Sequence, residues 1–380
     1  MSKIILLAAA AVAAMAPSST PVVEPQADPL STRSIFLTGV NLAGAEFGPP
    51  PRPGGPPAKH GVDYVYPSEA YVEGYKSPSY FLAKGMNTFR IAFLWERIQP
   101  KLMQGLDHAE LARLARTVNT LARRGAWVIL DLHNYARYEG KTIGSQDVTL
   151  EAFADVWKRL AATFKHNPKV LFGIMNEPYE MPTETWVDAA NAALVAIRAT
   201  RARNIVLVPG NGYTSAGLWA SDVYGTPNAM ALDKIHDPLQ RIVFEAHLYL
   251  DHDGSGTNGE CPSATLGVER LQPFTDWLKA RKQLGFIGEF GAGTSDVCLE
   301  ALSSLATTML DNRDVLLGWT YWAAGPWWPV DYFSRIEPGE KSDAPQMRAL
   351  LPHLGAPQTV GAMAPHLSAP EDGTARAIAR

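Results

Sequence analysis

The sequence lacks several features that would assign it to common classes of protein. Its formal net charge is −4 and it has no run of Lys and Arg, so a nucleic-acid or anionic-membrane partner is not expected. No segment approaches the ~18 consecutive apolar residues of a membrane-spanning helix. It also has no HExxH, CxxC, GxGxxG or phosphate-loop motif, and its nine His are scattered. We therefore expect neither a metal nor another cofactor.

Cysteine is nearly absent too, because the chain has only Cys261 and Cys298. In an exported protein such a pair suggests one disulfide that closes a loop of moderate length. Two free buried thiols are the alternative. The sequence does predict export, since Lys3, the apolar stretch 4–13 and a small-x-small pattern at 14–16 resemble a secretion signal.

The rest of the composition indicates one large folded domain. Apolar residues make up 46 % of the 380 residues and charged residues only 19 %, which is enough for a sizeable core. We expect a signal peptide at 1–16, a Pro/Ala-rich linker at 17–31, a catalytic domain at 32–352 and a disordered tail at 353–380. The mature protein should be a monomer that is secreted or periplasmic.

Eight short apolar runs alternate with longer segments of helical periodicity. Such runs are typical of parallel strands that are buried on both faces. They predict an α/β fold, a (β/α)8 TIM barrel with a single catalytic domain. A doubly wound sheet is the alternative, but it would favour a Gly-rich phosphate turn after the first strand, which is missing. The predicted strands are 35–41, 88–93, 127–133, 170–176, 205–209, 242–247, 286–289 and 316–322.

Two glutamates, Glu177 and Glu289, each follow an apolar strand-like run. Two carboxyl groups carried past the carboxyl ends of buried strands can flank one bond from opposite sides. Hydrolysis of a glycoside needs such a pair, one group as acid and base and the other as nucleophile or activator of water. Taken singly, each Glu is more often a loop charge or a helix cap.

Other predicted strand ends carry polar or aromatic residues that a purely structural barrel would not need. Any one of them could be structural, but together they indicate a site, because a barrel gathers its chemistry at these ends. The residues are Arg90, His133, Asn176, His247, Tyr249 and Trp322.

These motifs together resemble glycoside hydrolase family 5. The resemblance rests on Asn-Glu-Pro at 176–178, Gly-Glu-Phe at 288–290 and Leu-His-Asn-Tyr-Ala-Arg-Tyr at 132–138. The segment 247–261 is similar to the endo-β-1,4-glucanase (cellulase) branch in particular. The resemblance covers about 35–352.

The resemblance implies a role for each matching residue. Glu177 would be the acid/base and Glu289 the nucleophile of a retaining reaction, with Arg90 and Tyr249 beside the nucleophile. Asn176 would bond the sugar 2-hydroxyl, and His133 and His247 would line the subsite of the distorted sugar. Trp322 would be its apolar floor, and Asn134 and Trp219 are further expected substrate contacts.

The resemblance therefore implies a secreted endo-β-1,4-glucanase that acts on a cellulose-like β-glucan without a cofactor. A β-mannanase or a mixed-linkage β-glucanase of the same superfamily is the nearest alternative. A non-catalytic carbohydrate-binding barrel is a further one, although it would have no need of both glutamates with Arg90 and Tyr249.

Overall fold

The computed structural model describes residues 35–49, 58–68, 75–339 and 342–355. The predicted signal peptide, the linker and nearly all of the predicted tail lie outside these residues. None of the helices in the described segments is long and apolar enough to cross a bilayer.

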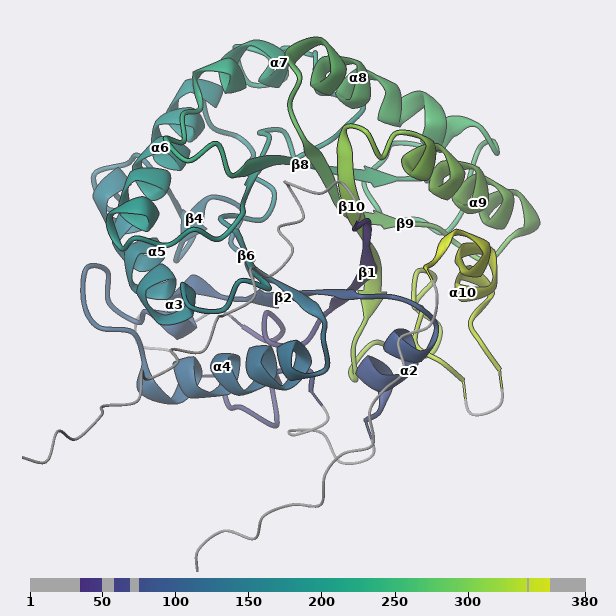
Figure 1. The fold of residues 1–380 in the computed structure, drawn as a ribbon, viewed down its shortest axis with the longest axis horizontal. Helices are drawn as coiled ribbons and strands as arrows, with labels where there is room; N and C mark the ends of the chain where they lie inside the picture. Colours follow the sequence, from purple (N-terminus) through teal and green to yellow (C-terminus); the bar gives the residue numbers. More distant parts are fainter. Residues whose placement is uncertain (1–34, 50–57, 69–74, 340–341, 356–380) are drawn as a thin grey trace, which may run out of the picture.

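Eight parallel strands close into a barrel, which confirms the predicted (β/α)8 fold (Figure 1). Each predicted strand overlaps one observed strand. Around the barrel the order is β1-β2-β3-β6-β7-β8-β9-β10, and β10 pairs with β1 to close it. The strands are β1 (Leu37–Leu42), β2 (Thr88–Phe93), β3 (Trp127–Leu132), β6 (Val170–Gly173), β7 (Val206–Pro209), β8 (Ile242–Tyr249), β9 (Gly285–Gly291) and β10 (Leu316–Ala324).

Helices form a ring around these strands (Figure 1). The sequence accounts for the starts of two of them: the Asp107 carboxylate accepts hydrogen bonds from two backbone N–H groups at the start of α4, and the Thr149 hydroxyl accepts one, from Ala152, at the start of α5. The helices are α2 (Ser77–Ala83), α3 (Trp95–Ile98), α4 (His108–Arg123), α5 (Leu150–Phe164), α6 (Thr183–Ala199), α7 (Asn228–Ala231), α8 (Leu266–Arg281), α9 (Asp296–Asp311) and α10 (Pro345–Leu350), with 3-10 turns η1 (Leu232–Lys234) and η2 (Leu351–His353). A two-stranded ribbon, β4 (Arg137–Tyr138) and β5 (Lys141–Thr142), follows β3.

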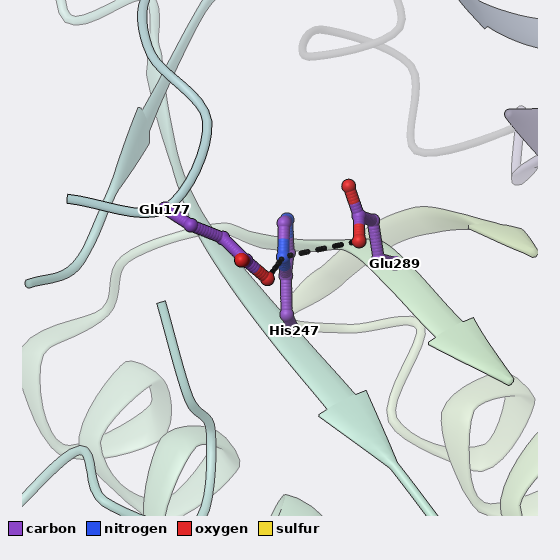
Figure 2. A group of neighbouring side chains, drawn as sticks. All are labelled: Glu177, His247 and Glu289. Atoms are coloured by element: carbon purple, nitrogen blue, oxygen red, sulfur yellow. Dashed lines mark hydrogen bonds and ion pairs between the residues drawn. The ribbon is translucent and has the colours of Figure 1, made fainter. Parts of the chain in front are cut away.

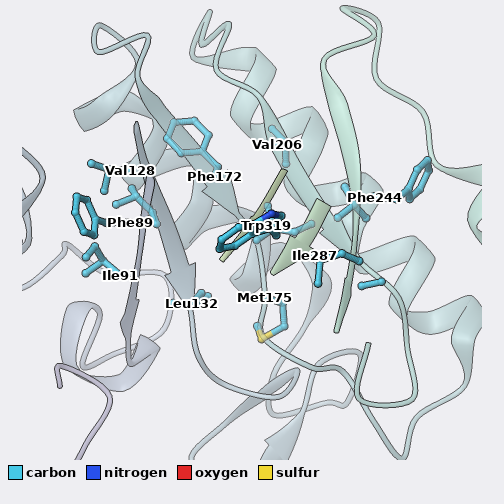
Figure 3. Close-up of a cluster of buried hydrophobic side chains, with 14 of the residues drawn as sticks. Phe89, Ile91, Val128, Leu132, Phe172, Met175, Val206, Phe244, Ile287 and Trp319 are labelled. Carbon is cyan, nitrogen blue, oxygen red and sulfur yellow. The ribbon is translucent and has the colours of Figure 1, made fainter. Parts of the chain in front are cut away.

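Side chains of the barrel strands alternate between two apolar regions, because successive residues of a strand point to opposite faces. One set packs outward under the helices in a large cluster, part of which Figure 3 shows. The other set fills the barrel and forms a smaller cluster that we call the inner apolar layer. Its members are Leu37, Trp127, Ile129, Leu171, Ile205, Leu207, Val243, Phe286 and Leu317.

A disulfide joins Cys261 to Cys298, as expected from the cysteine count. It ties the loop after β8 to the first turn of α9, with 5.2 Å between the two Cα atoms. The described part of the chain has no free cysteine.

Candidate active site

Polar side chains replace apolar ones in the barrel interior toward the carboxyl ends of the strands. Arg90 pairs in register with Ile129 of the inner apolar layer, so both point inward, and Asp131 is two residues further along the same face. Glu245 follows Val243 of that layer in the same way. These three charged side chains are fully buried.

Arg90 joins these carboxylates to the second candidate glutamate. Its guanidinium lies 3.0 Å from Asp131, 3.2 Å from Glu245 and 2.8 Å from Glu289. A buried charge persists only when it is paired and hydrogen-bonded, and three carboxylates meet that need here. Arg90 also donates to the amide oxygens of Asn41 and Asn176, both at 2.9 Å.

Glu289 lies in β9 with each carboxylate oxygen held by a different donor. Oε1 accepts from Arg90, and Oε2 accepts from the hydroxyl of Tyr249 at 2.5 Å. Its side chain is only 4 % exposed. Both contacts favour the ionised form and fix the direction in which the carboxylate faces.

Glu177 follows β6 in a left-handed backbone conformation, with φ of 43°. A non-glycine residue adopts this region rarely, and such strain collects at functional sites. Glu177 Oε1 lies 2.7 Å from Nδ1 of His247, and its side chain is 15 % exposed.

Glu177 and Glu289 face each other across His247 (Figure 2). His247 Nδ1 is 3.6 Å from Glu289 Oε2, and one oxygen of each glutamate and a His247 nitrogen all lie within 4.8 Å of one another. Among the described residues this is also a group that could hold a metal ion. The Arg90 charge beside Glu289 acts against a cation there.

The two carboxyl groups have pKa values that are shifted in opposite directions. Burial raises the pKa of Glu177, and the Glu289 charge adds to this, while the hydrogen bond to His247 opposes it. Burial also acts to raise the pKa of Glu289, but the positive charges of His247, Arg90 and His133 outweigh it and lower that pKa. The site therefore favours a protonated Glu177 beside an ionised Glu289.

His247 contributes a positive charge between them. Burial acts to lower its pKa, but the charge of Glu289 and the hydrogen bonds to Glu177 and Glu245 raise it to about 10. The side chain is thus protonated at neutral pH, and its Nε2 lies 3.3 Å from Glu245.

Asn176 and His133 complete one wall of the site. Because Arg90 donates to the Asn176 amide oxygen, the amide nitrogen points the other way, 3.3 Å from His133 Nε2. His133 bonds Asp131 through Nδ1 at 2.7 Å. Although burial opposes it, the Asp131 charge raises the His133 pKa.

Trp322, at the end of β10, is partly exposed and stacks on His133, with ring centroids 5.5 Å apart and an angle of 16° between the rings. Trp328 meets the Trp322 ring edge-on at 5.9 Å and stacks on Tyr332. Phe47 also meets the Trp328 ring edge-on, at 5.1 Å. An aromatic wall thus extends from the His133 side of the site.

Gly288 is the residue before Glu289, and the packing leaves no room for a side chain there. A Cβ atom at this position would lie 1.9 Å from Glu245 Oε1 and 2.9 Å from His247 Nε2. Glycine at 288 therefore lets these two side chains reach the site.

Two predicted substrate contacts lie elsewhere in the packing. Trp219 is 0 % exposed and packs on Phe274 and Trp277, so its prediction as a sugar platform is wrong. Asn134 is buried, and its amide accepts from the Trp95 N–H and donates to Glu96. These bonds hold the loop after β3, and the role of Asn134 as a substrate contact stays a prediction.

Four residues of the site, Asp131 among them, were not named from the sequence. Glu245 lies two residues before His247 in β8, so both side chains point to the same face of the strand. This spacing could have identified Glu245 from the sequence. Asn41 donates to the backbone oxygen of Gly288 at 2.9 Å while accepting from Arg90. Burial raises the pKa of Glu46, beside His133, to about 7, although the His133 charge acts against this shift.

A barrel with two glutamates facing each other at its strand ends, one favoured as the acid and one as the anion, is the arrangement of a glycoside hydrolase. The model of the cellulase family, glycosyl hydrolase family 5, matches residues 77–325. The chain belongs to this family.

Relatives that are named as endoglucanases agree with this assignment. The chain is 40 % identical over 301 residues to endo-beta-1,4-glucanase B of Emericella nidulans, covering 79 % of this chain and 85 % of that one. It resembles XacCel5A in complex with cellopentaose at 46 % identity and a TM-score of 0.79, covering 84 % and 99 % of the two chains. Pseudomonas stutzeri endoglucanase Cel5A in complex with cellobiose is 37 % identical, with a TM-score of 0.74 and coverage of 85 % and 93 %.

Proposed function

We propose that the protein is an endo-β-1,4-glucanase that cleaves internal bonds of a β-1,4-glucan with retention, through Glu177 as acid/base and Glu289 as nucleophile. One observation carries the assignment: the two carboxyl groups approach within 4.8 Å and have pKa values shifted in opposite directions. Retaining glycosidases hold their carboxyl groups about 5–5.5 Å apart, whereas inverting ones need ~6.5–9.5 Å for a water between them.

In the first step Glu289 attacks the anomeric carbon, and the bond from that carbon to the glycosidic oxygen breaks. Glu177 gives its proton to the departing oxygen, so the leaving chain departs as a neutral alcohol. Burial and the Glu289 charge keep that proton on Glu177 until it is needed. The product of the step is a glycosyl ester on Glu289.

In the second step Glu177, now a carboxylate, takes a proton from a water molecule. The resulting hydroxide attacks the same carbon and releases Glu289 as a carboxylate. Its negative charge returns beside Arg90 and His247, which stabilise it.

The surrounding side chains would act through charge and position. Arg90 and the Tyr249 hydroxyl aim the two oxygens of Glu289, which is worth several kcal/mol because a misplaced nucleophile reacts slowly. The Asn176 amide, oriented by Arg90, can donate to the sugar 2-hydroxyl in the oxocarbenium-like transition state. Trp322 offers a flat apolar face beside them.

The β-1,4-glucan substrate is supported by the endo-β-1,4-glucanase of Emericella nidulans and by the cellopentaose and cellobiose in complex with the two solved neighbours. The catalytic domain would be the barrel itself, acting as a monomer. Export would follow from the signal-like residues 1–16, and a disulfide suits an oxidising compartment.

A substrate panel tests this proposal directly. The purified protein is incubated with carboxymethylcellulose, barley β-glucan and β-mannan, and the products are resolved by size. We expect rapid loss of viscosity and short oligosaccharides from carboxymethylcellulose, with the β-anomer formed first. Faster cleavage of mannan, or an α-anomer as first product, would overturn the assignment.

A further inference from the structure

We propose that Gly256 is a positioning residue for the reaction: the backbone at Gly256 supports the ring of Tyr249, whose hydroxyl holds the nucleophile Glu289. The inference rests on the proposed function and concerns a residue that the two-step reaction does not use. Gly256 lies between β8 and α8, in a segment that we call the β8 loop, residues 250–265.

Gly256 lies so close to the Tyr249 ring that no side chain fits between them. A Cβ atom at this position would be 2.7 Å from Cδ1 of Tyr249 and 2.8 Å from both Cε1 and Cγ. Carbon atoms that are not bonded to each other are most favourable about 3.5–4.0 Å apart. The φ of 71° at Gly256 is also in the left-handed region, which glycine adopts without steric cost. Glycine therefore lets the loop backbone pass directly beside the ring.

The place of this ring matters because the Tyr249 hydroxyl donates to Oε2 of Glu289 at 2.5 Å. A tyrosine side chain has two χ angles, so the place of its ring fixes the place of its hydroxyl. Burial acts to raise the Glu289 pKa, and the hydrogen bond from Tyr249 is one of the interactions that outweigh it. Other charged groups around Glu289 are Arg90, His133, His247 and Glu177.

Asp251 fixes the backbone of the β8 loop from within. It is 2 % exposed, and its carboxylate accepts hydrogen bonds from the N–H groups of residues 256, 257 and 258 at 3.2–3.3 Å and from Ser255 Oγ at 3.1 Å. The N–H of Gly256 itself is thus bonded to this carboxylate. Hydrogen bonds to an ionised group are stronger than those between neutral groups, so Asp251 holds the loop firmly beside the ring.

Two further links anchor the β8 loop to helices. Arg270 of α8 donates to the carbonyl oxygens of residues 249, 251 and 252 at 2.6–2.7 Å, which joins the Tyr249 backbone to the loop. The disulfide between Cys261 and Cys298 ties the loop to α9. A loop that is held at so many points has little freedom to move away. A methyl group at 256 would therefore displace the Tyr249 ring.

A double-mutant cycle between Gly256→Ala and Tyr249→Phe tests this role, with kcat/KM on cellohexaose as the readout. Gly256→Ala alone should lower kcat/KM by about 10- to 100-fold, because a misplacement on the order of 1 Å can cost 10²-fold. Tyr249→Phe has no hydroxyl to misplace. Adding Gly256→Ala to it should therefore change kcat/KM by less than about twofold.

Gly254→Ala is the matched control in the same loop. Gly254 has φ of 74°, so alanine is strained there as it is at 256, but the nearest atoms to its Cβ would be those of Arg270, at 3.4–3.7 Å. Both Ala variants should lower the melting temperature. Only Gly256→Ala should lower kcat/KM, and Gly254→Ala should stay within about twofold of the unmodified enzyme.

The pH–rate profile gives a second readout that a merely structural role would not move. The Tyr249 hydroxyl helps to lower the Glu289 pKa, so its displacement raises that pKa. The acidic limb should then move to higher pH in Gly256→Ala and stay in place in Gly254→Ala. If Gly256→Ala does not fold, Asp251→Asn loosens the same backbone and should give a smaller change in the same direction, again lost in the Tyr249→Phe background.

Equal losses in both backgrounds, or an acidic limb that does not move, would reject the positioning role and leave Gly256 with a role in folding alone. A loss in Gly254→Ala as large as in Gly256→Ala would reject it too, because backbone strain would then explain both. If the unmodified protein does not hydrolyse cellohexaose at all, the proposed function itself fails, and this inference with it.

Discussion

The two ends of the barrel interior are built from the same strands but from different kinds of side chain. Toward the amino ends, the inner apolar layer contains no charged residue among its nine members. Toward the carboxyl ends, Arg90 is buried with the carboxylates of Asp131, Glu245 and Glu289, each of which lies within 3.2 Å of its guanidinium. Buried charges are a poor source of stability, so the second arrangement is explained by chemistry. One end of the interior stabilises the fold, and the other performs the reaction.

Loss of the nucleophile should give the largest fall in turnover with the smallest change in stability. Glu289→Gln keeps the shape of the side chain but cannot form the glycosyl ester, so we expect turnover to fall on the order of 10⁴-fold or more. Substrate binding and the melting temperature should change little. Kinetics on carboxymethylcellulose and a thermal melt check this, and residual activity within tenfold of the unmodified enzyme would contradict it.

The effect of removing the acid, Glu177, should depend on the leaving group of the substrate. Glu177→Ala is expected to slow cellohexaose hydrolysis by about 10²–10⁴-fold, the usual contribution of a general acid. A dinitrophenyl cellobioside should lose far less in its first step, because its leaving group needs no proton. Equal losses on both substrates would show that Glu177 is not the acid.

A substitution of Arg90 tests the role of the charged end of the barrel interior while both reacting glutamates stay in place. Arg90→Lys keeps the charge but loses the planar guanidinium that reaches Glu289, Asp131 and Glu245 together, so activity should fall by about 10²-fold. Arg90 helps to lower the pKa of Glu289. A weaker contact therefore raises that pKa, and the acidic limb of the pH–rate profile should move to higher pH.

A matched control for this substitution lies outside the site. Arg198 is likewise paired with a carboxylate, through a two-pronged contact with Asp237 at 2.8 and 2.9 Å, and both side chains are buried. Arg198→Lys should lower the melting temperature and leave the pH–rate profile in place. If Arg90→Lys behaves like Arg198→Lys, Arg90 is a structural ion pair and the comparison fails.

The apolar end should give the smallest effect on turnover. Leu207→Ala removes a fully buried side chain of the inner apolar layer, at a cost of about 2–5 kcal/mol of unfolding free energy. β7 carries none of the reacting groups, so kcat/KM per folded molecule should stay near its original value. Denaturant unfolding and steady-state kinetics of the same variant check this prediction. A changed pH–rate profile would contradict it, because it would show that the apolar end of the interior affects the reacting groups.

The barrel and its main polar residues could be predicted from the sequence because they follow from local pattern. Apolar runs identified all eight strands, and polar residues at the strand ends identified Glu177, Glu289, Arg90, His247 and Tyr249, which the structure brings together. Parallel strands bring their carboxyl ends to one edge whatever the details of packing.

What was missed depends on packing that no local pattern reveals. Trp219 and Trp322 were both predicted as substrate contacts, yet Trp219 is enclosed by Phe274 and Trp277 whereas Trp322 stays partly exposed. The stack of Tyr179 on Tyr213 joins two loops that are separated by a helix and a strand. Only the folded chain places such residues side by side.

The most direct test of the central claim is the capture of the glycosyl ester on Glu289. An activated 2-deoxy-2-fluoro-β-cellobioside slows both steps through its fluorine, while its good leaving group keeps the first step ahead of the second. We expect the intact mass to rise by one fluorocellobiosyl unit and peptide mapping to place the label on Glu289. No adduct alongside ordinary cellohexaose activity, or a label on Glu177, would contradict the account.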